Sequence, residues 1–323
     1  MFADGIEFSG DISTTWGIFA PWTNKDTAGD FSLGNTNFTG KVDAWYGNSS
    51  ALAEGTVSYD ALTNKLDFSL GELWIDYTDS MWGIRIGRQN VVWGKADGID
   101  ITNVICPSDL SSFAAMTSDN SKLPVDALRL SFSGNQFTAD AYWIPFFTPA
   151  VLPAEKIAGL PIEKPGLSLW NGEYGLKFSG YFPLFDISVY GFYGWDDNPF
   201  VEYKSTSEGM VVTGKYRNMT MLGIDAAIPI KAVVLRTEAA FFPQRYFTYD
   251  ERRNELSALA GLDWMPTGWT LTAQYFCDYF TGSMDNLDRK DVYTHGATLS
   301  ISKSLLNETT ELTVYTKITV LFT

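Results

Sequence analysis

The sequence predicts an all-β fold, a transmembrane antiparallel β-barrel of about 14 to 16 strands with sixteen favoured, and three observations predict it. Apolar and polar residues alternate with a period of two along the whole chain. Short turns alternate with long loops between the alternating segments. The composition combines 15% aromatic residues with only 19% charged residues, whereas soluble domains carry about a quarter charged residues.

The alternation is clearest in the first segment, residues 5–20, where Ile6 and Phe8 fall on one parity and Glu7 and Asp11 on the other. Successive side chains of a strand point to opposite faces, so one face suits hydrocarbon and the other suits water. The pattern recurs in residues 36–46, 51–59, 185–191, 233–239 and 312–320. We count about fifteen such segments of roughly ten residues, the length that crosses a bilayer at the usual strand tilt.

The connections between these segments alternate in length. Short turns are expected at residues 48–50, 79–80, 134–135, 183–184, 229–231 and 266–268. Longer loops are expected at residues 21–34, 93–124, 145–168, 196–209, 243–254 and 281–291, with 63–65 as the one short member of this set. Short periplasmic turns and long extracellular loops are typical of outer-membrane barrels. Residues 1–323 are therefore expected to form one barrel domain. Single-chain bacterial barrels have an even number of strands, so an odd count predicts that one segment is miscounted or that a closing strand lies beyond Thr323.

Composition excludes several other classes of protein. No apolar run reaches the roughly 18 to 20 residues of a membrane-spanning helix, and the mean hydropathy is -0.06. The aromatic content excludes a disordered chain. The 23 basic and 38 acidic residues disfavour nucleic-acid binding. Two cysteines, Cys106 and Cys277, allow at most one bridge and exclude a disulfide scaffold. A soluble β-sandwich or propeller also shows alternation, but the polar parity here is rich in Gly, Ser and Thr, and the segments are long.

The segment 81–94 departs from the alternation. Arg85 and Gln89 share one parity, while Arg88 falls on the other. An arginine facing lipid at the membrane midplane costs about 2 to 4 kcal/mol, so Arg88 is expected either near the interface or turned inward by a bulge. The loop that follows, about 93–124, contains apolar residues that an exposed loop would not need, namely Ile99, Ile101, Val104, Ile105 and Phe113. A loop of this length is usually functional, and we expect it to fold into the lumen and narrow the pore.

The same region carries a motif. Gly87-Arg88-Gln89 is followed by Trp93-Gly94, then by Asp97, Asp100 and Pro107-Ser108-Asp109. This pattern resembles the G-[RK]-Q…WG…D…P.D signature of a poorly characterised family of Gram-negative outer-membrane barrels, similar in general plan to alginate-export porins. The motif covers residues 84–109, and the rest of the chain matches only as a barrel. The resemblance implies an outer-membrane, channel-type protein with a plugged or constricted lumen.

Charged residues on the polar parity are candidates for the pore lining. Acids outnumber bases roughly two to one there, and the set includes Asp126, Arg236, Glu238 and Asp263. Opposed charges across a constriction select polar or ionic solutes. The alternative is that they form ion pairs between neighbouring strands, each of small energetic value. The candidate constriction residues are Arg85, Arg88, Gln89, Trp93, Lys95, Asp97, Asp100, Asp109 and Arg129.

These features favour a porin-like channel in the bacterial outer membrane, through which small polar or charged solutes diffuse passively. The net charge of -15 predicts a mild preference for cations. The alternative is a non-conducting barrel that acts as a scaffold, receptor or adhesin through its extracellular loops. The expected partners are outer-membrane lipid and a small polar or ionic solute, with further protein partners at the loops 145–168 and 196–209. The sequence leaves the oligomeric state open.

An enzymatic role is not expected. The single histidine, His295, shares the apolar parity with Tyr293 and Leu299, which favours contact with lipid over catalysis. Asp97 and Asp100 lack the full spacing of a calcium loop. Neither cysteine has metal-ligating neighbours in the sequence, so no metal site and no cofactor are expected.

Overall fold

The computed structural model describes residues 4–19, 29–111, 121–153, 159–206, 209–284, 287, 291–305 and 310–320. The chain divides into two compact units. Unit 1 comprises Met1–Val91, Cys106–Leu130 and Ala150–Ala158, and unit 2 comprises Val92–Ile105, Ser131–Pro149 and Gly159–Thr323. Regular structure in the described residues is β-strand apart from one short 3-10 helix, η1 (Leu169–Asn171). No helix in the described part of the chain is long and apolar enough to cross a membrane.

Unit 1 is an antiparallel sheet in which strands that follow one another in the chain are also neighbours in space. Its strands are β1 (Gly5–Ile18), β2 (Phe31–Tyr46), β3 (Ser49–Asp60), β4 (Lys65–Thr78), β5 (Trp82–Gln89) and the beginning of β6 (Val125–Ser133). The register between β1 and β2 runs from Gly5 opposite Trp45 to Ile18 opposite Phe31. The order of these strands is the up-and-down order that short turns impose.

Unit 2 continues with the same antiparallel neighbour pattern. Its strands are β7 (Phe137–Ile144), β9 (Glu173–Tyr181), β10 (Asp186–Trp195), β13 (Asn218–Ile230), β14 (Val233–Tyr246), β15 (Arg252–Trp264), β16 (Trp269–Phe280), β17 (Tyr293–Leu305) and β18 (Thr310–Val320). Among the described residues, six strands of the sheet begin in unit 1 and nine in unit 2, fifteen in all. This number confirms the predicted range and is one fewer than the sixteen favoured.

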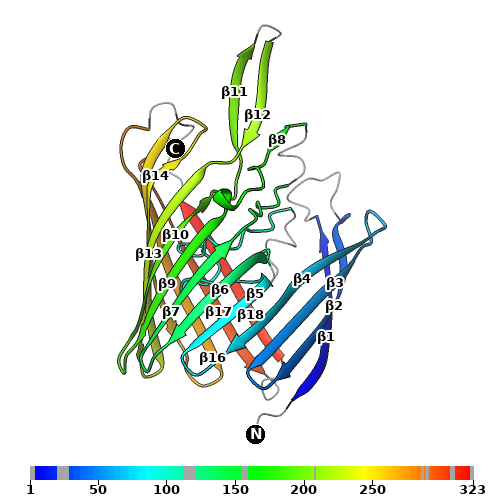
Figure 1. Ribbon diagram of the computed structural model, residues 1–323, viewed down its shortest axis with the longest axis vertical. Coiled ribbons are helices and arrows are strands. Elements are labelled where there is room, and N and C mark those ends of the chain that lie inside the picture. Colours follow the sequence, from blue (N-terminus) through cyan, green and yellow to red (C-terminus); the bar gives the residue numbers. More distant parts are fainter. Residues whose placement is uncertain are drawn as a thin grey trace. The chain divides into compact units, whose positions relative to one another are not determined.

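A second, three-stranded sheet lies at the loop end of unit 2. The strands β11 (Phe200–Thr206) and β12 (Gly209–Lys215) form a hairpin, and β8 (Ile162–Glu163) pairs with β12 in parallel. Figure 1 shows this hairpin projecting beyond the ends of β10 and β13. The loop predicted at 196–209 is therefore longer than expected and contains regular structure.

The two faces of each sheet differ as the alternation predicts. In β10 and β13, Val189 and Ile224 lie opposite each other and are exposed. One residue further along each strand, Tyr190 and Asp225 are buried on the other face. Because an exposed row of large apolar side chains is stable only against lipid or a partner, this is the membrane-facing side of the sheet. We call it the outer face and the opposite side the inner face.

Several predicted loop boundaries differ from the structure, among them three at long loops of the main sheet. β2 begins at Phe31, inside the predicted loop 21–34, and β14 and β15 both extend into the predicted loop 243–254. In each case the strand pairing continues past the residues at which the apolar alternation weakens. Backbone hydrogen bonds to the neighbouring strand thus extend the strands beyond the apolar pattern.

Candidate functional site

Residues 92–105, here called the inward segment, contain no helix or strand and pack against the inner face of unit 2. Trp93, Ile101 and Ile105 are all at most 3% exposed. The predicted burial of this loop's apolar residues is confirmed for Ile101 and Ile105, whereas Ile99 and Val104 are only half-buried and Phe113 lies outside the described residues. Buried apolar side chains hold the inward segment against the sheet by removing apolar surface from water.

One carboxylate, that of Glu238 in β14, holds both ends of the inward segment. Its Oε2 accepts the backbone N–H groups of Lys95 and Ala96 at 2.8 and 3.0 Å. Its Oε1 accepts the backbone N–H and the hydroxyl of Thr102, both at 2.7 Å. Glu238 is only 2% exposed, and hydrogen bonds to a buried charged group are stronger than neutral ones. The four donors therefore fix the path of the inward segment.

Two glycines allow the inward segment to approach the wall this closely. Gly94 has a φ of 90°, and a Cβ there would lie 2.4 Å from an Oε1 of Glu238. On the wall itself, a Cβ at Gly223 of β13 would lie 2.7 Å from Cγ2 of Thr102. Side chains at either position would push the inward segment away from the inner face.

An arginine of β14 adds a charged anchor beside Glu238. Arg236 donates through Nη1 to the carbonyl oxygen of Lys95 at 2.6 Å and through Nη2 to Asp97 at 2.6 Å. The same Nη2 contacts Asp263 of β15 at 2.7 Å. Gln274 of β16 also accepts the N–H of Asp97 at 3.0 Å. The Asp97 side chain nevertheless remains 63% exposed, so it combines a fixed position with access to water.

Aromatic side chains add further contacts at the start of the inward segment, around Trp93. The Trp93 ring lies 5.0 Å from the ring of Tyr190 in β10 and 6.0 Å from that of Tyr142 in β7. The Tyr190 hydroxyl accepts the N–H of Gly94 at 3.2 Å and donates to Asp225 of β13. Contacts to β7, β10, β13, β14 and β16 thus tie the inward segment to five strands of unit 2.

The two candidate arginines of β5 lie on different faces of unit 1. Arg85 pairs with Asp76 of β4 at 3.0 Å and stacks 3.8 Å above the ring of Trp74. Arg88 pairs with Asp126 of β6 through two hydrogen bonds of 3.0 Å. The register places Arg88 opposite Leu73, without a bulge between β4 and β5.

The ion pair of Arg88 and Asp126 excludes one of the two alternatives for Arg88 and corrects the expectation for Asp126. Arg88 shares its parity with Ile86, and Asp126 shares its parity with Leu130, both of which are exposed on the outer face. Arg88 is therefore not turned inward by a bulge, and the prediction that Asp126 faces the lumen is wrong. A bidentate carboxylate gives the arginine a counter-charge where lipid gives none.

The remaining candidate residues of unit 1 have structural contacts. Gln89 is 1% exposed and donates to the carbonyl oxygen of Ala127 at 3.0 Å. Asp109 accepts the N–H of Ser111 at 2.9 Å. Arg129 lies in β6, half-buried. In unit 2, Asp100 is exposed and accepts a hydrogen bond from Asn103 at 3.0 Å.

His295 lies on the outer face, as predicted. It stands opposite Cys277, and its Nδ1 is 2.8 Å from the hydroxyl of the exposed Tyr275. Cys106 is fully buried, whereas Cys277 is partly exposed. No group of three or more histidine, cysteine, aspartate or glutamate side chains in the described residues could hold a metal ion.

Glu238 was predicted only as one of the pore-lining charges, and Gln274 and Tyr190 were not predicted as parts of the site. Glu238 was one of many acids on the polar parity, and its partners lie 136 to 143 residues earlier in the chain. The available signal was the pair of glycines at the contact, Gly94 and Gly223, because glycine in a strand often marks a close approach of another backbone.

Comparison with known proteins gives a family and a fold. The model of the family described as "Protein of unknown function (DUF1302)" matches residues 18–315. The outer membrane channel DcaP of Acinetobacter baumannii is similar in structure, with a TM-score of 0.56 at 8% identity over 98% of this chain and 89% of that chain. OmpT (in-vitro folded), an outer membrane protein of Vibrio cholerae, has a TM-score of 0.52 at 10% identity, over 95% of this chain and 84% of that chain. No curated protein matches this chain.

These similarities confirm the predicted fold, while the resemblance of residues 84–109 to alginate-export-type porins stays a prediction. The exposed apolar face and the antiparallel strand order are those of a bacterial outer-membrane β-barrel. Because the family model covers most of the sequence, the chain belongs to the DUF1302 family of proteins of unknown function.

Proposed function

We propose that the chain is a passive outer-membrane channel for small polar or charged solutes, narrowed by the inward segment. The observation that carries this proposal is the anchoring of residues 92–105 to the inner face through Glu238 and Arg236. A segment held by charge-assisted bonds to several strands stays in place while solutes pass, as a constriction must. The name of the structurally similar DcaP, an outer membrane channel, supports the same function.

The charges at the inward segment favour polar solutes and cations. Asp97 is exposed and held by Arg236, and Asp100, further along the same segment, is also exposed. Acidic groups lining a narrow aqueous path raise the local concentration of cations. We assign Lys95, Asp97 and Asp100, all in unit 2, to the proposed path. The proposed constriction does not include Arg88.

Liposome swelling tests the proposal. Purified protein reconstituted into liposomes should admit small sugars and amino acids at rates that fall as solute size rises, and cationic amino acids should enter faster than anionic ones of similar size. Liposomes without protein are the control. Solute entry no faster than in these controls would contradict a channel.

A non-conducting binding scaffold is the second candidate, and one observation favours it. Leu167, Leu169 and Trp170, at and before η1, are 85%, 64% and 90% exposed. Exposed apolar side chains that lie together suit a partner surface. A scaffold requires these residues for partner binding and gives no solute flux, so the swelling assay separates the two functions.

A further inference from the structure

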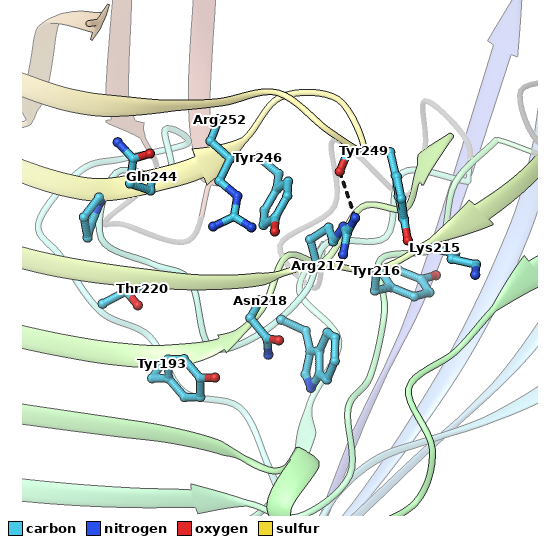
Figure 2. A pocket seen from close by; sticks show the side chains of 12 residues that line it. Tyr193, Lys215, Tyr216, Arg217, Asn218, Thr220, Gln244, Tyr246, Tyr249 and Arg252 are labelled. Atoms are coloured by element: carbon cyan, nitrogen blue, oxygen red, sulfur yellow. Dashed lines mark hydrogen bonds between the residues drawn. The ribbon is translucent and has the colours of Figure 1, made fainter. Parts of the chain in front are cut away.

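A pocket of about 490 Å³ lies at the loop end of unit 2, away from the inward segment. It forms where the ends of β10, β13, β14 and β15 meet the residues between β12 and β13. Figure 2 shows tyrosine rings and two arginines, Arg217 and Arg252, around this space. The proposed channel gives this pocket no role.

The strand register places the pocket on the outer face. Tyr193 and Thr220, which line the pocket, stand opposite each other in β10 and β13. Leu222 lies two residues after Thr220 in β13. It stands opposite Phe241 of β14, which in turn stands opposite Leu256 of β15, and all three side chains are exposed. Residues two apart in a strand share a face, so the pocket adjoins the membrane-facing apolar band. It lies at the end of that band nearest the long loops.

The pocket is cationic, although the chain carries a net charge of -15. The guanidinium of Arg217 stacks 3.6 Å from the ring of Tyr249 and 4.7 Å from that of Tyr246. The guanidinium of Arg252 lies 4.3 Å from the ring of the same Tyr246. No carboxylate is among the residues that line the pocket.

Neither arginine is neutralised within the described part of the chain. Arg217 donates one hydrogen bond, to the carbonyl oxygen of Tyr249 at 3.0 Å, which Figure 2 shows as a dashed line. Its Nε is buried and has no hydrogen-bond partner in the described residues. The nearby buried acid Asp196 is already paired with Arg245 at 2.9 Å. The pocket therefore contains two arginines without a counter-charge, one of which has an unused hydrogen-bond donor. This arrangement favours the binding of an anion.

We propose that this pocket binds the phosphate group of an anionic lipid in the outer leaflet of the membrane. Guanidinium groups match phosphate oxygens through paired hydrogen bonds. Tyrosine and tryptophan side chains at the border of an apolar band are typical of the headgroup region. The acyl chains of such a lipid would lie along the apolar row of Leu222, Phe241 and Leu256. Free phosphate offers the same anionic group, but only a lipid uses the adjoining apolar surface. The proposal does not depend on whether the barrel conducts.

Native mass spectrometry of the full chain in neutral detergent tests this proposal. The probes are lipid A with two phosphates, the same glycolipid without phosphate, and inorganic phosphate. The wild type should retain the phosphorylated lipid and not the dephosphorylated one. The variant Arg217→Gln with Arg252→Gln should bind the phosphorylated lipid about tenfold more weakly or worse, because charge-assisted bonds are lost.

Arg253→Gln is the matched control, because Arg253 follows Arg252 in β15 but does not line the pocket. This control should bind the phosphorylated lipid as the wild type does. Equal retention of both glycolipids by the wild type would overturn the proposal, as would unchanged binding by the double variant. Displacement of the lipid by equimolar inorganic phosphate would assign the pocket to a soluble anion and overturn the lipid assignment. If the double variant fails to fold, Arg252→Gln alone and the comparison of glycolipids on the wild type decide.

Discussion

Oε1 of Glu238 accepts both the backbone N–H and the hydroxyl of Thr102, each at 2.7 Å, although the two residues are 136 positions apart. The other oxygen of the same carboxylate accepts two further N–H groups of the inward segment. A long loop is entropically costly to fix in one path. The four bonds to one buried acid offset part of that cost and explain why residues 92–105 follow the wall.

Replacing this carboxylate should loosen the inward segment. In Glu238→Gln, the side-chain amide nitrogen would replace one carboxylate oxygen and would face two donors of the inward segment. Those buried donors would lose their acceptor, which costs about 1–3 kcal/mol of stability. We expect larger and noisier single-channel currents and a lower free energy of unfolding in urea. Asp186→Asn, at the turn end of β10, is the control and should behave as the wild type. Wild-type current amplitude and noise in Glu238→Gln would contradict this role.

Removing the arginine beside Glu238 should change ion selectivity. Arg236 neutralises Asp97 and Asp263, at 2.6 and 2.7 Å. In Arg236→Gln these two acids keep their charge without a counter-charge, so cation preference should increase. The measurement is the reversal potential in a salt gradient. Lys231→Gln removes the same charge at a turn and should leave the reversal potential unchanged; an equal shift in both variants would assign the effect to net charge alone.

The outer-face ion pair of Arg88 and Asp126 should matter more for stability than the pair of Arg85 and Asp76. Asp126→Asn leaves a charge facing lipid, which costs about 2–4 kcal/mol at the midplane and about 0–1 near the interface. The double variant Arg88→Leu with Asp126→Leu removes both charges and should recover the loss. Urea unfolding in lipid measures these changes.

Asp76→Asn is the comparison for this pair, because Asp76 accepts a hydrogen bond from Arg85, which lies in β5 like Arg88 but on the inner face. An ion pair that water can reach is worth about 0–1 kcal/mol. Equal destabilisation by Asp76→Asn and Asp126→Asn would contradict a position of Arg88 facing lipid at the membrane midplane.

The hairpin of β11 and β12 should depend on pH through Lys215. This lysine bridges Glu163 of β8 and Glu202 of β11, both at 3.1 Å. Hydrogen bonds to Glu163 and Glu202 raise the pKa of Lys215 above its ordinary 10.5. Burial acts to raise the pKa of Glu202, but bonds from Lys215 and Lys204 outweigh it and lower this pKa below 4.5.

The two shifts set the pH window of this contribution. The stabilisation of the hairpin by the ion pairs of Lys215 is complete above pH 4.5. It is lost as the pH falls through the lowered pKa of Glu202. At alkaline pH it is complete below 10.5 and is lost as the pH rises through the raised pKa of Lys215. Hydrogen exchange of residues 200–215 should therefore show protection at neutral pH that Lys215→Met removes. Lys204→Met, which keeps the bridge to β8, should retain most of it.

The wall of the barrel could be predicted from the sequence because most of its strands repeat the same two-residue pattern. Ile6 and Phe8 already indicate a lipid-facing parity, and both are exposed in β1. Where the pattern weakens, the prediction failed. β11 lies in a region interpreted as loop, although Val201 and Tyr203 alternate with the buried Glu202. This alternation is shorter than the run of about four to eight residues that indicates a strand.

The contacts of the inward segment could not be predicted, for a different reason. The burial of Ile101 and Ile105 followed from their apolar character, which is local information. The choice of Glu238 over other acids of the polar parity depends on which strand the segment crosses, and that follows from the folded path of the chain. The pairing of Arg88 with Asp126 was missed because parity was counted without the register that fixes it.

Single-channel conductance in planar bilayers tests the central claim, that the inward segment narrows an open path. The wild type should give discrete conductance steps, and replacing residues 95–102 by a short Gly-Ser linker should increase the step size. A linker variant that refolds, as judged by its strand content, and conducts no more than the wild type would contradict the constriction. Absence of steps in both proteins would contradict the channel itself.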